Sequence, residues 1–213
     1  LTYGCADRVF WCWKFTDFPG ARFQEYLYYV SYFYSNQTPK NSWYKNKYLL
    51  KILQAGFRYW AKIQYPNGSF DEAYPHEKSL AAVSFTCFYL SEAYLLVETD
   101  LDIETKEIFK KTLLNAAEWL NAADEYHGFL SNHLAVAAAA CMHAGRIFNN
   151  QSFKNRSQYF LKKIYSHQSK SEGWMDEYGG ADIGYQTHGT FYLARIWQLT
   201  KDNELLNSLK KAN

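Results

Sequence analysis

A short glycine-containing turn recurs along the chain, each time between two segments that read as helices. Its three clearest copies, each with an aromatic residue one or two places after the glycine, are residues 67–72, 127–133 and 172–178. A more degenerate fourth copy covers residues 13–20, ahead of a helix predicted to begin at Ala21. The clear copies lie about 45 to 60 residues apart, close to the length of one helical hairpin. This recurrence predicts stacked helical hairpins.

The segments between the turns carry apolar residues at helical spacing, as at Phe109, Leu113 and Leu120. Alternation with a period of two, which is typical of strands, is nearly absent. The sequence therefore predicts an all-α fold. The predicted helices cover residues 21–35, 44–65, 80–97, 103–123, 133–148, 152–167, 187–200 and 203–212.

Within the repeats, helices with one charged side alternate with helices of small apolar residues. Lys106, Lys110 and Lys111 mark the charged side of one helix, whereas residues 134–142 are almost entirely small and apolar. This alternation predicts one helix against water and its successor against neighbouring helices, which is the arrangement of an α/α toroid. A complete ring needs about six hairpins, and 213 residues supply about four. We therefore expect a single toroid-like domain over residues 1–213, either as an incomplete ring or as part of a longer protein.

Composition narrows the class of ligand. The net charge is +2 and the basic residues are dispersed, so no nucleic-acid footprint is present. The longest apolar stretches, such as residues 134–142, are shorter than the ~20 residues of a membrane span. The four cysteines form no CxxC pair and no zinc pattern, so we expect no metal and no cofactor. Aromatic residues make up 19% of the chain, which suits a carbohydrate groove, although core packing explains most single rings equally well.

Two segments resemble a known family. Residues 131–148, which begin Ser-Asn132-His133, resemble the Asn-His segment that opens an inner helix in the α/α toroid of heparinase II/III-like and alginate-lyase-like proteins. Residues 178–192, which include Tyr185, resemble the region that supplies the catalytic tyrosine of that family. The resemblance covers roughly residues 110–200. The family also carries a β-sandwich domain with a further catalytic histidine, so we expect that a further domain is missing from this chain.

The resemblance implies β-elimination on a uronate polysaccharide. Asn132 and a donor histidine, for which His133 is the candidate, would bind the substrate carboxylate while a base removes the C5 proton. Tyr185 would protonate the leaving oxygen, with Tyr192 as its substitute and His188 in support. An epimerase would share the proton abstraction. The compartment stays open from the sequence, although a lyase of this kind favours a location outside the cytoplasm.

Polar and aromatic residues at the turns are candidates for substrate binding. They are Asp71, Glu72, His76, Trp174, Asp176, Glu177 and Gln186. Structural alternatives exist for the site residues: Asn132 is a favoured helix N-cap, His133 suits a hydrogen-bonded turn, and Tyr185 suits packing.

Two rival functions remain open. A glycoside hydrolase would need two carboxyl groups about 6.5–9.5 Å apart, for which the acidic residues of the turns, with Asp182, are candidates. The same acids would equally stabilise helix N-termini. The second rival is a non-catalytic scaffold that binds glycans or proteins. The leading prediction is a polysaccharide-processing domain that acts as a uronate lyase or a related epimerase.

Overall fold

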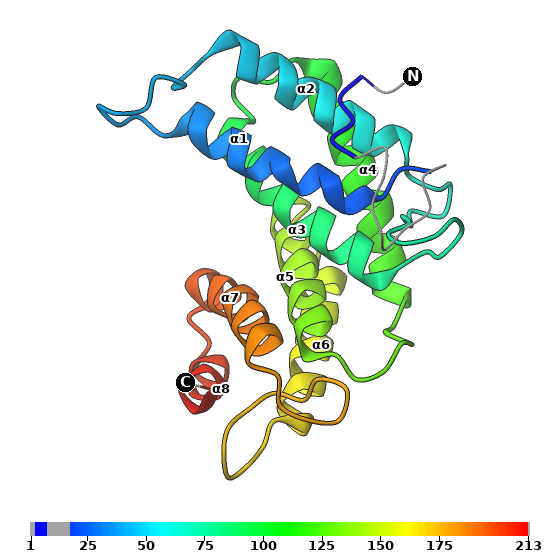
Figure 1. The fold of residues 1–213 in the computed structure, drawn as a ribbon, viewed down its shortest axis with the longest axis vertical. Coiled ribbons are helices and arrows are strands. Elements are labelled where there is room, and N and C mark those ends of the chain that lie inside the picture. The colour runs from blue at the N-terminus through cyan, green and yellow to red at the C-terminus, as the bar shows by residue number, and fades with distance from the viewer. Residues whose placement is uncertain (1–2, 8–17, 213) are drawn as a thin grey trace. The chain divides into compact units, whose positions relative to one another are not determined.

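The computed structural model describes residues 3–7 and 18–212, and in this part of the chain it contains helices and no strands (Figure 1). About two thirds of the chain, 66%, is helical, which confirms the predicted all-α fold. The elements are the 3-10 helix η1 (Ala21–Glu25) and the α-helices α1 (Tyr26–Ser35), α2 (Lys47–Lys62), α3 (Leu80–Val97), α4 (Ile103–Ala122), α5 (Ser131–Ile147), α6 (Gln151–His167), α7 (Ile183–Thr200) and α8 (Asn203–Ala212).

The predicted helices agree with the observed ones except at a few ends. The largest difference is α7, which begins at Ile183 and not at residue 187. Its N-cap is Asp182, whose carboxylate accepts a hydrogen bond from the backbone N–H of Tyr185 at 2.8 Å. Tyr185 and Gln186 therefore lie in the first turn of a helix and not in a loop.

The chain divides into two compact units, Leu1–Trp119 and Leu120–Asn213. The first unit is built around α3, which packs against α1 and η1. Rings of α2, α4 and the first turn extend its core: Trp60 stacks on Phe70 with 5.0 Å between ring centroids, and Tyr94 stacks on Phe109 at 4.4 Å. Buried aromatic pairs of this kind add to the stability that burial alone supplies.

Helix α3 is also long and apolar enough to cross a membrane by composition, with a mean hydropathy of 1.6 over 18 residues. This apolar stretch is longer than residues 134–142. Within the described structure 83% of the helix is buried, as expected of a core helix.

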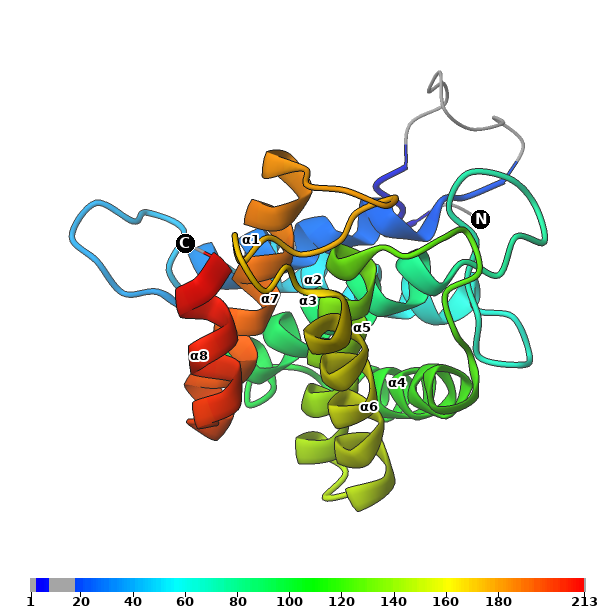
Figure 2. The ribbon, with the colours of Figure 1, turned by 90° about the horizontal axis from the view of Figure 1, so that it is seen from below.

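The second unit is built around α5, which packs against α6 and α7, while α7 also packs against α8 (Figure 2). Small side chains from Ala135 to Ala140 are buried at this centre and let the neighbouring helices approach closely. The closest approach to α7 is at Gly189, where an added Cβ atom would lie 3.3 Å from the Cα atom of Asn132. This contact brings the first turn of α5 against the second turn of α7.

Two of the three clear copies of the repeated turn have a steric basis, which an earlier glycine, Gly4, shares, whereas an added Cβ atom at Gly128 would meet only the Tyr178 ring at 3.9 Å. Gly4, Gly68 and Gly173 all have left-handed backbones, with φ of 89°, 90° and 81°. A Cβ atom at each would come within 2.1, 2.2 and 1.8 Å of a backbone oxygen, those of Ala55, Asn115 and Lys211, respectively. Only glycine fits such a backbone conformation at such a contact. The copy that the sequence analysis placed at residues 13–20 falls largely outside the described residues, and Gly4 occupies the equivalent position instead.

Candidate active site

The second unit joins the start of α5 to the turn that follows Gly173. The backbone N–H of Ser131 donates to the carbonyl of Asp176 at 3.1 Å, and that of Tyr178 donates to the carbonyl of Phe129 at 3.0 Å. A single antiparallel bridge between Leu130 and Glu177 completes the junction. Two segments about 45 residues apart in the sequence are thus held in register by their backbones.

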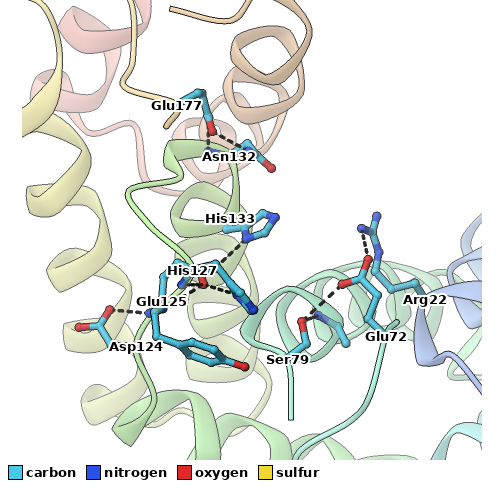
Figure 3. Close-up of polar contacts among 11 residues, drawn as sticks. Arg22, Glu72, Ser79, Asp124, Glu125, His127, Asn132, His133 and Glu177 are labelled. Atoms are coloured by element: carbon cyan, nitrogen blue, oxygen red, sulfur yellow. Dashed lines mark hydrogen bonds and ion pairs between the residues drawn. The ribbon is translucent and has the colours of Figure 1, made fainter. Parts of the chain in front are cut away.

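Asn132 and Glu177 meet at this junction (Figure 3). The carboxylate of Glu177 accepts one hydrogen bond from the backbone N–H of Asn132 at 2.6 Å and one from its side-chain Nδ2 at 2.8 Å. Both residues are buried, with 2% and 5% of their surface exposed. The N-cap of α5 is Leu130, so the interpretation of Asn132 as a helix cap is wrong. Burial raises the pKa of Glu177, and the hydrogen bonds from Asn132 offset part of that rise.

His133, the next residue of α5, is held by a second carboxylate. Its Nδ1 lies 2.6 Å from Oε2 of Glu125, and because a carboxylate can only accept, Nδ1 is the donor (Figure 3). The other oxygen of Glu125 accepts from the backbone N–H of His127 at 3.1 Å and lies 3.0 Å from its Nδ1. The Glu125 side chain is only 2% exposed, whereas that of His133 is 21% exposed. The histidine therefore reaches the surface and its carboxylate partner does not.

The loop that carries Glu125 is anchored on α6. Asp124 accepts hydrogen bonds from the hydroxyl of Tyr159 at 2.7 Å and from Nζ of Lys163 at 2.9 Å. Phe129 stacks on His167 at the end of the same helix, with 3.7 Å between centroids. These contacts fix the position of Glu125 before any ligand is present.

The hydrogen bonds around Glu125 change its acidity. Burial alone would raise its pKa, but the bonds from His133 and from the backbone and ring of His127 outweigh that effect and lower the pKa from 4.5 to about 2. Glu125 therefore stays ionised at every pH at which the protein is expected to work.

This shift predicts a pH dependence of stability. Because folding lowers the pKa of Glu125, its stabilising contribution is present above pH 4.5 and is lost as the pH falls toward 2. We expect the difference in free energy of unfolding between the wild type and Glu125→Gln to shrink by about 3 kcal/mol over that range. Urea denaturation at a series of pH values measures it.

The exposed Glu172→Gln is the control for this measurement, and its difference from the wild type should stay nearly constant. Folding raises the pKa of Glu177, so its contribution to stability changes with pH in the opposite direction. All three proteins contain Glu177, so this contribution cancels in the comparison. Parallel pH profiles for the wild type and Glu125→Gln would contradict the assignment.

Two exposed tyrosines lie at the edge of the site, Tyr178 before α7 and Tyr185 in its first turn. Tyr185 is 43% exposed, and its ring centroid lies 6.4 Å from that of Tyr178, which is 66% exposed. Tyr192 lies two turns further along α7, is fully buried, and its hydroxyl lies 2.6 Å from Nε2 of His188. Tyr185 thus reaches the surface near the junction, whereas Tyr192 and His188 form a contact along their own helix.

The other candidates of the second unit have mainly structural contacts. Gln186 accepts from the backbone N–H of Met175 at 3.1 Å and donates to the carbonyl of Ala212 at 2.6 Å. Trp174 donates from its ring N–H to Glu172 at 2.6 Å. The carboxylate of Asp176 accepts from the backbone N–H of Gly179 at 2.8 Å and so closes its own turn. The capping interpretation is confirmed for Asp182, the N-cap of α7.

The candidates of the first unit form a separate cluster. Asp71, 6% exposed, accepts from the hydroxyl of Tyr65 at 2.6 Å and from the backbone N–H groups of His76 and Lys78 at 2.8 and 3.0 Å. Its carboxylate organises the loop between the first turn and α3. His76 is exposed at the edge of this loop.

Glu72 has an ionic partner in the same unit. Arg22 donates to Glu72 at 3.1 Å and to Glu25 at 2.5 Å, and its guanidinium lies 3.7 Å from the centre of the Phe85 ring (Figure 3). Glu72 also lies 3.4 Å from the hydroxyl of Ser79, the N-cap of α3. Asp71 and Glu72 therefore both hold local structure in place.

Sequence reasoning missed two residues of the site, Glu125 and Tyr178. Tyr178 follows Glu177 directly and could have been noticed from its place in the third turn. Glu125 precedes His133 by eight residues in an irregular segment, and no periodicity connects the two. Their contact depends on the loop between α4 and α5, which only the tertiary structure fixes.

These contacts define an all-α domain in which Asn132 and His133 open the buried helix α5. Glu177 holds Asn132, Glu125 holds His133, and Tyr178 lies near both carboxylates. A comparison with known families identifies the domain further. The family model described as the Ulvan lyase N-terminal domain matches residues 20–212, and the chain belongs to this family. Its membership supports a polysaccharide lyase, and it points to ulvan lyases instead of the heparinase and alginate-lyase groups that the motifs resemble. No curated protein and no solved structure matched the chain.

Proposed function

We propose that this chain is the helical part of a lyase that cleaves a uronate-containing polysaccharide of the ulvan type by β-elimination. The observation that carries the proposal is the start of α5, where Asn132 is held by Glu177 and the adjacent His133 is held by Glu125. Family membership supports the lyase class and a polysaccharide substrate. The glycine turns that recur in both units support the expectation of an α/α toroid, and we retain the expectation of a further domain.

Asn132 is assigned to the substrate carboxylate. Elimination begins with loss of the weakly acidic C5 proton, so the site must stabilise the negative charge that spreads onto the carboxylate. The side-chain amide of Asn132 has two N–H bonds, of which one donates to Glu177. The second is the donor to the substrate in this proposal, and Glu177 sets its direction.

His133 is assigned as the base, whereas the resemblance implied that it would bind the substrate carboxylate. Ionised Glu125 accepts a hydrogen bond from Nδ1–H, which makes Nε2 of the neutral ring the atom that takes the C5 proton. A carboxylate that orients a histidine in this way is a recurrent catalytic arrangement. The electron pair of the C5–H bond then forms the C4–C5 double bond.

Tyr185 is assigned as the acid. As the bond between C4 and the glycosidic oxygen breaks, that oxygen takes the proton of the Tyr185 hydroxyl, and solvent later restores it. The exposure of Tyr185, against the burial of Tyr192, favours this choice. The products are one saccharide with a new double bond and one with a new hydroxyl group.

Ultraviolet absorbance tests the proposal, because the product contains a double bond conjugated with the carboxylate. The protein is mixed separately with ulvan, alginate, heparan sulfate and chondroitin, and we expect absorbance to rise fastest with ulvan. A flat trace with new reducing ends would move the assignment to a hydrolase. A flat trace with solvent deuterium incorporated at C5 would indicate an epimerase, and no change in any assay would favour a binding scaffold.

A further inference from the structure

Tyr178 has a backbone conformation that is unusual for its residue type. Its φ is +57°, in the left-handed region that bulky side chains rarely occupy. Glycine would adopt this conformation without a steric penalty, and the neighbouring Gly179 indeed has φ of +90°. Strained positions of this kind are frequent at functional sites, where the surrounding structure holds the unfavourable backbone in place.

The core does not explain why a tyrosine stands here, since 66% of Tyr178 is exposed. A ring that leaves two thirds of its surface in water contributes little by burial. The backbone contact of the residue, its N–H to the carbonyl of Phe129, would be made equally well by glycine. Neither burial nor the backbone contact of this residue therefore requires an aromatic ring.

The ring nevertheless has a neighbour on each of two sides. Its Cδ1 atom would be only 3.9 Å from a Cβ atom added at Gly128, so the ring lies beside the loop that leads into α5. On its other side it faces Tyr185, with an angle of 57° between the ring planes. Burial and the nearby Tyr185, Glu125 and Glu177 raise the pKa of the Tyr178 hydroxyl, so the phenol stays neutral.

We propose that Tyr178 and Tyr185 form an aromatic subsite that receives one pyranose ring of an acidic oligosaccharide. Tyr178 provides a face for the C–H groups of the sugar, and Tyr185 provides its hydroxyl at the bond to be cleaved. The inference rests on the proposed function and adds a residue that binds without taking part in proton transfer. A neutral, exposed ring beside Tyr185, near the carboxylates that hold Asn132 and His133, suits this task, because it attracts the apolar face of a sugar without repelling its carboxylate.

Replacement of Tyr178 by glycine separates this role from a structural one. Glycine relieves the left-handed backbone, so Tyr178→Gly should unfold at the same temperature as the wild type or a higher one. We expect its dissociation constant for a size-defined ulvan oligosaccharide, measured by titration calorimetry, to rise about five- to tenfold. Tyr178→Phe keeps the ring and should bind within about twofold of the wild type.

Lys201→Gly is the matched control. Lys201 also has a left-handed backbone, with φ of +56°, but it caps the far end of α7. It should give the same thermal effect as Tyr178→Gly and leave oligosaccharide binding unchanged. Unchanged binding by Tyr178→Gly, or a loss in Tyr178→Phe as large as in Tyr178→Gly, would overturn the aromatic subsite.

Binding and turnover together distinguish this inference from the proposed function. Tyr185→Phe should keep its affinity for the oligosaccharide and lose double-bond formation. If the wild type binds but shows no elimination, the proposed chemistry fails while the Tyr178 variants still test the subsite. If elimination proceeds and Tyr178→Gly matches the wild type in KM and in Kd, the subsite fails and the chemistry stands.

Discussion

Replacing His133 with alanine is expected to lower the rate of double-bond formation by about a thousandfold, the range typical of a lost general base. The side chain is partly exposed at the start of α5, whereas its partner Glu125 is inaccessible, so the imidazole is the member of the pair that can reach a substrate. The fold should survive with reduced stability, because the ring is partly exposed but its removal takes one hydrogen bond from the buried carboxylate of Glu125. Initial rates of ultraviolet absorbance, with the thermal midpoint measured in parallel, provide the test.

His127→Ala is the control for this loss. His127 contacts the same carboxylate through its Nδ1, but its side chain is more exposed, at 38%, and it lies in the loop before α5. Its removal should reduce the rate by no more than about tenfold, through a less firmly held Glu125. Equal losses in the two variants would mean that the carboxylate and not His133 is the functional group.

Replacing Glu177 with alanine is expected to cost about 2 to 4 kcal/mol in the free energy of unfolding. The carboxylate is the acceptor for both the backbone and the side-chain N–H of Asn132, and both residues are buried. Removing it leaves two buried donors without a partner at the first turn of α5, where no helical carbonyl is available to replace it. Denaturant unfolding measures the loss.

Glu172→Ala is the matched control in the same turn. Glu172 is exposed, and its contact is with the ring N–H of Trp174, so its replacement should change stability by less than about 0.5 kcal/mol. Activity adds a second readout, since Glu177→Ala should also lose elimination when the Asn132 amide is no longer oriented. A stable and fully active Glu177→Ala would contradict the role given to this pair.

The fold could be predicted from the sequence because local signals determine it. Helical spacing at positions such as Phe109 and Leu113, and glycines at Gly68 and Gly173, depend only on neighbouring residues and on steric limits. The predicted start of α7 was wrong because Asp182 was considered as a catalytic acid and as a helix charge, but not as the residue at which the helix begins. The first turn glycine was missed because Gly4 is followed by Cys5 and Ala6 and not by the aromatic residue that follows the glycine in the other copies.

The candidate site was predicted only in part. Asn132, His133 and Tyr185 were recognised from short motifs, and the structure brings each of the first two together with a carboxylate that the sequence did not pair with it. Glu177 was predicted as a substrate-binding residue, yet its hydrogen bonds are to Asn132. Glu125 could not be predicted, because its contact with His133 depends on how Asp124 is anchored on α6. Tertiary contacts of this kind leave no periodic trace in a sequence.

The backbone pairing of residues 129–131 with residues 176–178 has a practical consequence for engineering. Because Ser131 and Tyr178 each depend on a carbonyl of the opposite segment, neither segment can be exchanged for that of a relative without disturbing the other. Attempts to redirect substrate preference by loop grafting should therefore transplant the two segments as one matched cassette. A graft of either segment alone would displace Asn132, whichever sugar the new segment was chosen to bind.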